Sequence, residues 1–443
     1  MRWYSISGIL CVYGLLKEFR PSEPYMFIYQ NTVMNISAEV LNGDVYPYWT
    51  YSYLTALVPV FILTDLLLYK PVLIVESLSY IAVWLLLIFG SAVWTQQLVE
   101  LFYGWATATE IAYFAYIYVK VEREHFARVT VWVRAALQSG RCLGYLLSQL
   151  IIMFGLGSYL TLNYLSLGSL CITFAFALIL PWVRWEEVVE REVSNKGEQV
   201  FCLNCYSGIK ESLPLSNVKQ PESYKNFALL KLKTLWTDFK RIYSDSFLVK
   251  WSLWWAMTSC GNLMISNYIQ TLWANNQTEE SQKYNGFVEA LTPLIGNMKL
   301  RKIDWNRWGE LCLTVAAIAD FGLLFTLSKT SNLYVMYGCY ATFRVLYQAM
   351  ITISQFNLAD RLIVQSYGLI FGFNTLVALA LQALMTVVFV DKRGLGMEIQ
   401  SQFLVYAYYH LLIAIIFLGA SVYRIPRMLY LKRARNPSLN SKL

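Results

Sequence analysis

Apolar runs of about 20 residues recur from one end of this chain to the other. Hydrophobic residues fill 57% of its 443 positions and charged residues fill 14%, a balance that soluble domains rarely have. A helix needs roughly 20 mainly apolar residues to cross the hydrocarbon core of a bilayer. The sequence therefore predicts an all-α, polytopic membrane protein that lies in a lipid bilayer.

The runs form two sets of six around one long polar segment. The first set is Ile6–Leu16, Trp49–Tyr69, Pro71–Trp94, Gln96–Lys120, about Arg128–Phe154 and about Leu160–Val183. The second set is Phe247–Trp273, Tyr284–Leu300, Trp308–Leu327, Asn332–Leu358, Ser366–Val390 and Gln402–Val422. Twelve spans arranged as six plus six match the architecture of the major facilitator superfamily. The expected parts are an N-terminal bundle, a cytoplasmic central loop, a C-terminal bundle and a cytoplasmic tail, at 1–183, 184–245, 246–423 and 424–443.

The loops indicate which side of the membrane each end occupies. Lysine and arginine crowd the segments 120–128, 184–250, 299–307 and 424–435. Cytoplasmic loops carry this excess of positive charge, so both termini and the central loop are expected in the cytoplasm. The sequons beginning at Asn35 and Asn276 then fall in outer loops, which makes these two residues candidate glycosylation sites.

The run Gln96–Lys120 carries two acids among its aromatic residues. On a helix, Glu100, Tyr103, Thr107 and Glu110 lie on one face, at spacings of three and four. A carboxylate that faces lipid costs about 2.5–3.5 kcal/mol, so this face is expected to border a cavity or a protein partner. Acids beside aromatic rings suit a flat organic cation. The alternative is two buried acids that hold neighbouring helices together.

The first run ends in a charged segment with two prolines, Lys17–Pro24. Pro21 and Pro24 break the helix and free backbone groups that must border a cavity in the membrane. Arg20 and Glu23 are three residues apart, and we expect them to pair.

Other charged groups lie within or at the edges of the runs. The acids are Glu76, Glu289, Glu310 and Asp320, and the bases are Arg134, Arg141 and Arg344. Arg134 and Arg141 are two turns apart, and we expect them to neutralise acids of the fourth run. Three further charges, Asp65, Asp360 and Arg361, sit at cytoplasmic helix ends, where ion pairs between helices set the closed state.

Aromatic and amide groups add to the expected site. Trp49 and Trp84 are candidate ligand contacts, although tryptophan is also common at membrane edges; that explanation is weaker for Trp84, which is deep in its run. Asn267 needs a hydrogen-bond partner or a ligand. Tyr284 and Glu289 belong to the short eighth run, and Glu289 adds an acid from the second half.

Several classes of function have no support in the sequence. There is no GxxxxGK[ST] motif and no GxGxxG after a strand, and two histidines supply neither a catalytic set nor a metal cluster. We expect no enzymatic activity, no cofactor, no metal and no nucleic-acid partner. Any energy would come from an ion gradient acting through the intramembrane acids, so a coupled proton or anion is a further candidate partner.

The chain resembles the reduced folate carrier and thiamine transporter family along nearly its whole length. The matching stretches are KEFRPSEP at 17–24, YWTYSYL at 48–54, FILTDLLLYKPV at 61–72, LVELFYG at 98–104, EIAYFAYIY at 110–118, WSLWWA at 251–256, NYIQTLW at 267–273, YNGFVEA at 284–290, FGFNT at 371–375, DKRGL at 391–395 and QFLVY at 402–406. The resemblance implies the major facilitator fold and vitamin transport across the plasma membrane. The leading Lys-Glu of the first stretch is more similar to invertebrate, folate-like members.

The resemblance also bears on the substrate. Glu110 stands where a folate carrier is expected to have arginine, and Gln382 where it is expected to have lysine, so both favour the cation thiamine. Thiamine contacts would be Trp49, Trp84, Glu100, Tyr103, Asn267, Glu289 and Tyr367. Glu100 would be the main counter-ion, Trp49 and Tyr103 stacking partners, and Asn267 a hydrogen-bonding group. The alternatives are a reduced folate transporter, a non-transporting vitamin receptor and a channel.

Overall fold

The computed structural model describes residues 3–121, 123–184, 243–277, 283–295, 305–361 and 367–435, together with 236, 237, 239 and 240. Most of the expected central loop therefore lies outside the described residues. Within them, the chain forms helices and no strands.

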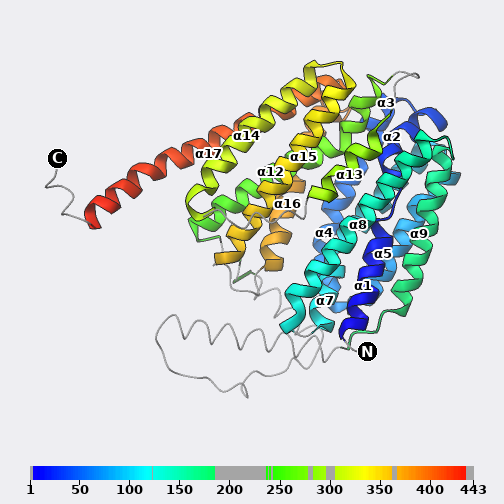
Figure 1. The fold of residues 1–443 in the computed structure, drawn as a ribbon, viewed down its shortest axis with the longest axis horizontal. Coiled ribbons are helices and arrows are strands. Elements are labelled where there is room, and N and C mark those ends of the chain that lie inside the picture. Colours follow the sequence, from blue (N-terminus) through cyan, green and yellow to red (C-terminus); the bar gives the residue numbers. More distant parts are fainter. Residues whose placement is uncertain are drawn as a thin grey trace.

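The first half contributes six long helical units. They are α1 (Trp3–Glu18), α4 (Pro47–Leu66), α5 (Lys70–Phe89), α6 (Val93–Ala108) followed by α7 (Glu110–Lys120), α8 (Phe126–Met153) and α9 (Tyr159–Ile179). Between α1 and α4 the chain makes the short turns η1 (Glu23–Tyr25), α2 (Met26–Ile28), η2 (Tyr29–Val33), α3 (Ala38–Val40) and η3 (Leu41–Val45). Figure 1 shows the long helices as one bundle, with these turns at the end opposite the N-terminus.

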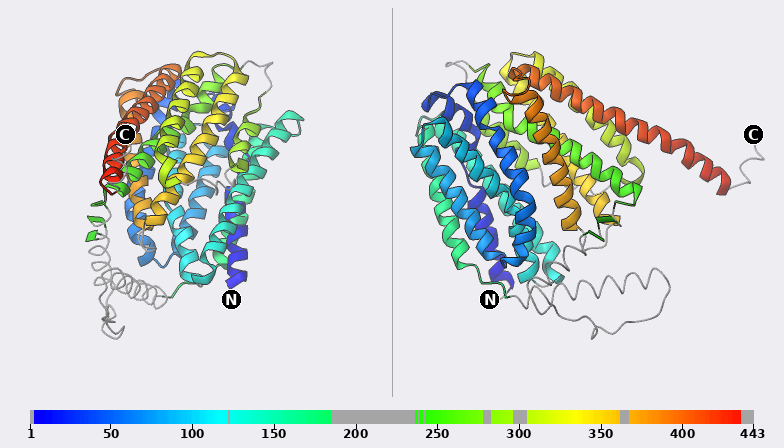
Figure 2. Two further views of the ribbon diagram at one scale, coloured as in Figure 1. Left: turned by 60° about the vertical axis from the view of Figure 1, so that its left-hand side comes forward. Right: turned by 180° about the vertical axis from the view of Figure 1, so that it is seen from behind.

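The second half repeats this plan with six more units. They are α12 (Ser246–Ala274), α13 (Asn285–Ile295), α14 (Trp305–Lys329), α15 (Leu333–Arg361), α16 (Tyr367–Met385) continued by η7 (Thr386–Val390), and α17 (Ile399–Arg435). Figure 2 shows this second bundle beside the first, with α17 extending away from both. The helix α17 continues beyond Val422, where the last run was expected to end.

Five of the described helices are long and apolar enough to cross a membrane by length and composition. These segments are Lys70–Phe89, Tyr159–Ile179, Leu311–Lys329, Ile370–Val390 and Ile399–Gly419. The other units are shorter or carry more polar side chains. Polar side chains inside a spanning bundle border protein or cavity because lipid offers them no partner.

The run Gln96–Lys120 was expected to be one helix, and this expectation is wrong. The chain breaks at Thr109, whose hydroxyl donates a hydrogen bond to the Ala106 carbonyl at 2.7 Å. The Thr109 backbone has φ −75° and ψ −8°, and α6 ends there. The break leaves Glu110 as the first residue of α7.

Small residues set the closest helix crossings. A Cβ atom on Gly140 of α8 would lie 2.2 Å from the Leu15 carbonyl oxygen of α1. Between the bundles, a Cβ on Gly286 of α13 would lie 2.6 Å from the Tyr145 carbonyl oxygen of α8. Glycine permits this approach, as in other membrane helix pairs.

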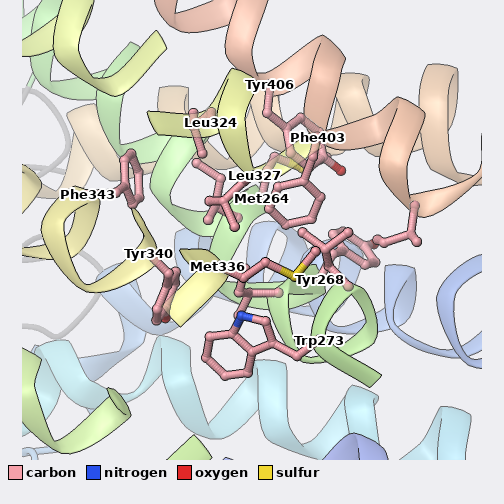
Figure 3. Packing of buried hydrophobic residues seen from close by; sticks show 14 of the residues in the cluster. Met264, Tyr268, Trp273, Leu324, Leu327, Met336, Tyr340, Phe343, Phe403 and Tyr406 are labelled. Carbon is pink, nitrogen blue, oxygen red and sulfur yellow. The ribbon is translucent and has the colours of Figure 1, made fainter. Parts of the chain in front are cut away.

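Large rings fill the core of the second bundle. Figure 3 shows Trp273, Tyr340, Phe343 and Met264 packed among residues of α14 and α17. The Trp273 and Tyr340 rings meet edge to face, with centroids 5.1 Å apart, a favourable geometry for aromatic pairs. This core holds α12 and α15 in fixed positions, and both helices border the cavity described below.

The two bundles are joined by polar contacts at the end that carries α2, α3 and α13. The Gly286 N–H donates to the Gln149 side-chain oxygen at 3.0 Å, and the Asn285 amide donates to the Pro24 carbonyl at 3.3 Å. The Gln270 amide donates to the Glu23 carbonyl at 2.9 Å. These contacts close one end of the space between the bundles.

Candidate functional site

A cavity of about 380 Å³ lies between the two bundles, and both supply its walls. The first bundle contributes the broken segment after α1 and residues of α4 to α8, and the second contributes α12, α13 and α15. The charged lining residues are Glu18, Arg20, Glu23, Glu100, Glu110, Arg141, Glu289 and Arg344.

The acidic stripe of the fourth unit faces this cavity. Glu100, Tyr103, Thr107 and Glu110 all line it, although the helix breaks before the last of them. Among the described residues, neither Glu100 nor Glu110 has a hydrogen-bond or ion-pair partner. Neither carboxylate therefore has a direct partner, although the charges of Lys17 and Arg141 act on Glu110 from a longer distance.

The broken segment after α1 places a buried arginine against the cavity. Arg20 pairs with Glu18 at 2.7 Å and with Glu23 at 3.1 Å. It also donates a hydrogen bond to the Tyr103 hydroxyl at 2.9 Å and lies 5.0 Å from the centre of the Tyr80 ring. The Tyr103 hydroxyl in turn hydrogen-bonds the Glu23 carboxylate. Arg20 therefore holds the broken segment after α1 against α6.

The arginines of α8 do not have the partners that the sequence suggested. Arg141 pairs with Glu18 of α1, Nε to Oε2 at 2.5 Å, and not with an acid of the fourth unit. Arg134 is exposed and lies 5.4 Å from the centre of the Phe114 ring. Glu18 is thus the direct partner of Arg141, and Arg141 acts on Glu110 of the fourth unit only from a longer distance.

The two tryptophans differ in their surroundings. Trp49 lines the cavity, and its indole N–H lies 3.4 Å from the Thr107 hydroxyl. Trp84 is fully buried and donates to the Ser22 hydroxyl at 2.8 Å. It is not among the lining residues, so it supports the broken segment from behind.

The second bundle faces the cavity with mixed charge. Glu289 accepts a hydrogen bond from the Tyr340 hydroxyl at 3.0 Å. Arg344 donates to the Asn262 side-chain oxygen at 3.1 Å and to the Ser266 hydroxyl at 2.5 Å. Asn267 also lines the cavity.

The remaining expected residues are elsewhere. Tyr284 stacks on Phe287, with ring centroids 6.3 Å apart, outside the cavity lining. Tyr367 begins α16, Asp65 lies in α4, Glu310 lies in α14, and Asp360 and Arg361 end α15; the side chains of these five residues lie outside the described part of the structure.

The two sequons differ in exposure. Asn35 is exposed, with a backbone φ of 56°. Asn276 is half-buried, and its side-chain nitrogen donates to the Leu272 carbonyl at 3.1 Å. Glycosylation at both stays a prediction.

Sequence reasoning missed the charge network at the cavity wall. Glu18 joins Arg20 and Arg141, and beside it Lys17 pairs with Glu76 at 2.8 Å, with both side chains buried. The signal was the density of charges in Lys17–Pro24, directly after an apolar run.

Among the described residues, two bundles of six helical units around a polar cavity form the major facilitator fold. A solved structure of the nucleoside transporter NupG has the same fold, with a TM-score of 0.61 and 12% identity over 94% of this chain and 99% of that one.

Sequence comparison gives the family. The model for the reduced folate carrier matches residues 1–405. Folate-like transporter 3 of Caenorhabditis elegans is 44% identical over 94% of this chain and 96% of its own length. Thiamine transporter 1 of Homo sapiens is 36% identical over 94% and 89%. The chain belongs to the reduced folate carrier family, which confirms the resemblance.

Proposed function

We propose that this protein carries a water-soluble vitamin across the plasma membrane and that the vitamin is thiamine. The observation that carries the proposal is the pair of cavity carboxylates, Glu100 and Glu110, which have no direct hydrogen-bond or ion-pair partner among the described residues. An unpaired charge in a low-dielectric site is costly, and a cationic ligand would relieve that cost. Thiamine is a cation with flat rings.

Arg20 and Arg141 already have direct ion-pair partners, so Glu100 and Glu110 are the acids proposed to bind the cation. Glu18 and Glu23 hold Arg20, and Glu18 also holds Arg141. Both arginines therefore have direct partners other than Glu100 and Glu110, although Arg141 also acts on Glu110 from a longer distance. Trp49 and Tyr103 also line the cavity, and aromatic rings bind cations through their faces.

The size of the cavity supports a compact ligand. Its volume of about 380 Å³ is near the lower end of the usual range for small-molecule sites, about 300–1,000 Å³. We propose that Glu100 is the main counter-ion, that Trp49 and Tyr103 stack on the ligand, and that Asn267 hydrogen-bonds it. Glu110 and Glu289 complete the acidic lining.

Transport would occur by rocking of the two bundles about this cavity. Contacts such as Gly286 to Gln149 close the end that carries the sequons. With both termini in the cytoplasm, this closed end is the outer one, so the cavity would open to the cytoplasm in this state. In the state that opens to the outside, these contacts would be broken. Binding of the vitamin would shift the equilibrium between the inward-open and outward-open states.

Uptake into cells that express the protein tests the proposal. We expect saturable uptake of labelled thiamine, accelerated by unlabelled thiamine inside the cell. A non-transporting receptor would bind thiamine without this exchange, and a channel would give unsaturable flux. Saturable uptake of reduced folate without uptake of thiamine would contradict the choice of vitamin.

Glu100→Gln is the variant that tests the counter-ion. It keeps the shape of the side chain and removes its charge, so thiamine uptake should fall at least tenfold with normal surface protein. Glu398→Gln, an exposed acid outside the cavity, is the matched control and should transport normally. Normal uptake by Glu100→Gln would make this acid structural.

Reduced folate is the second candidate substrate, and one observation favours it. Arg344 lines the cavity and donates to the neutral groups Asn262 and Ser266, so it could also receive a substrate carboxylate. Arg344→Gln should then abolish folate uptake and spare thiamine uptake. The folate hypothesis fails if this variant takes up folate normally.

A further inference from the structure

A second pair of titratable groups is buried in the C-terminal bundle, outside the substrate cavity. Asp320 of α14 and His410 of α17 are 3% and 0% exposed. The Nδ1 atom of His410 lies 3.6 Å from Oδ2 of Asp320. Each residue is near the middle of one of the apolar segments able to cross the membrane, Leu311–Lys329 and Ile399–Gly419.

The polar atoms of this pair are poorly satisfied. Oδ1 of Asp320 and both ring nitrogens of His410 have no hydrogen-bond partner among the described residues. A separation of 3.6 Å is longer than a normal hydrogen bond of about 2.7–3.2 Å. Buried polar groups in this condition are costly, and intramembrane ionisable groups commonly serve ion or proton pathways.

The charge of the pair depends on how many protons it holds. With none, a buried carboxylate faces a neutral imidazole, and the pair is negative. With two, it is positive. With one, it is neutral overall, and a shared proton lets the two side chains form a direct hydrogen bond. The apolar surroundings therefore favour one bound proton.

Neighbouring titratable groups already have other contacts. On α12, the Cys260 sulfur lies 3.7 Å from the Met385 sulfur. On α17, the Tyr409 and Tyr406 hydroxyls donate to the Met257 carbonyl and to Gln402. On α15, Tyr340 donates to Glu289, Arg344 to Asn262 and Ser266, and the Tyr347 hydroxyl lies 3.3 Å from that of Ser259. The titratable group of α14 at this place is Asp320, which is itself one of the two residues of the Asp320–His410 pair.

His410 contacts two helices that line the cavity. A Cβ on Gly261 of α12 would lie 2.5 Å from Nε2 of His410, so the ring lies directly on that backbone. The Phe343 ring of α15 meets the imidazole edge to face at 5.5 Å. The next residues along each helix, Asn262 and Arg344, hydrogen-bond each other at the cavity.

We propose that Asp320 and His410 form a proton-binding site that couples vitamin transport to the proton gradient. The proton would draw the two side chains together, and the movement of the imidazole would act on Gly261 and Phe343. Those residues would then shift the Asn262–Arg344 contact in the cavity wall. This proposal rests on the proposed transport function, because it needs a transported vitamin to couple to.

The test uses the full chain in liposomes that contain a trapped pH indicator dye. In the wild type, addition of thiamine should move protons, and steady-state thiamine accumulation should change by about tenfold for each pH unit of gradient if one proton moves per vitamin. Asp320→Asn and His410→Gln should lose both responses but keep thiamine exchange at equal pH. His125→Gln, which changes the chain's other histidine, is the matched control and should behave as the wild type.

Three results would overturn the proton site. They are a wild type that moves no protons with the vitamin, variants that keep the gradient response, and a control that loses it. The wild-type dye measurement needs no variant, so it decides the question even if a substitution prevents folding. Absence of thiamine exchange at equal pH would contradict the choice of vitamin instead, and the same gradient test would then be made with reduced folate.

Discussion

Lys17 and Glu76 form the most deeply buried ion pair among the described residues. Their charged atoms are 2.8 Å apart, and Tyr13 donates to the same carboxylate at 2.7 Å. Breaking a buried pair by removing one partner leaves an uncompensated charge, whereas removing both partners can be nearly neutral. The stability of the first bundle should therefore depend on the pair and not on either residue alone.

Lys17→Met should destabilise the protein by about 3–5 kcal/mol, because Glu76 then stays buried without its cation. The double variant Lys17→Met with Glu76→Leu should recover most of that loss. Thermal unfolding of the purified proteins measures both effects. A double variant no more stable than the single one would contradict this account.

The sequence predicts charged cavity residues better than it predicts their partners. Glu100 and Glu110 are evident because an acid in an apolar run is costly and needs an explanation. The partner of Arg141 is Glu18, and that contact depends on how the segment after α1 folds between helices. No local pattern encodes such a path, and the same path places Ser22 against Trp84.

At the scale of helices, hydropathy predicts number and order well. Among the described residues, each half has six helical units in the order of the apolar runs, although α13 has only 11 residues. Hydropathy does not predict breaks such as the one at Thr109, where α6 ends and α7 begins. It also does not predict which glycines lie at helix crossings.

Gly140→Ala should lower the unfolding temperature, because its Cβ would lie 2.2 Å from the Leu15 carbonyl of α1 and the two helices would have to separate. Gly168→Ala is the matched control, since nothing lies within 4 Å of a Cβ there. Alanine in a helix is favoured over glycine by about 0.5–1 kcal/mol, so the control should be neutral or more stable. Equal unfolding temperatures of the two variants would show that α1 and α8 do not approach each other this closely at Gly140.

A pair of ionic contacts links the bundles at the closed end. Lys392, in the loop before α17, lies 3.0 Å from Asp44 and 3.3 Å from Glu39. Hydrogen bonds to Asp44 and then to Glu39 raise the pKa of the Lys392 ammonium above its usual value. The raised pKa means that the stabilising effect of this charge persists at neutral pH and is lost only as the pH rises through that pKa.

Lys392→Glu should loosen this closed end, because three carboxylates would then repel one another. A cysteine placed at Gln270, which contacts Glu23 across the same boundary, should react several-fold faster with a membrane-impermeant reagent. Arg393→Glu makes the same charge change at the next position, where the contact with Asp391 is 4.0 Å long, and should have less effect. Equal rates in the two variants would remove this link from the closing mechanism.

At the scale of the whole molecule, the residues proposed to select the substrate line the cavity about which the two bundles are proposed to move. The acids of α6 and α7 face the same cavity as Glu289 and Arg344 of the second bundle. A ligand held there contacts both bundles at once, so its binding energy can shift the balance between the two open states. The proposed transport therefore requires the cavity carboxylates to bind a cation.

Thiamine binding to the purified protein measures that claim most directly. Loss of a charge-assisted contact worth about 1.5–3 kcal/mol should weaken the Kd for thiamine by about tenfold to a hundredfold in Glu100→Gln. The combined Glu100→Gln and Glu110→Gln variant should bind still more weakly, and Glu398→Gln should bind as the wild type does. An unchanged thiamine Kd in the combined variant, in protein that is folded and monodisperse, would contradict the account.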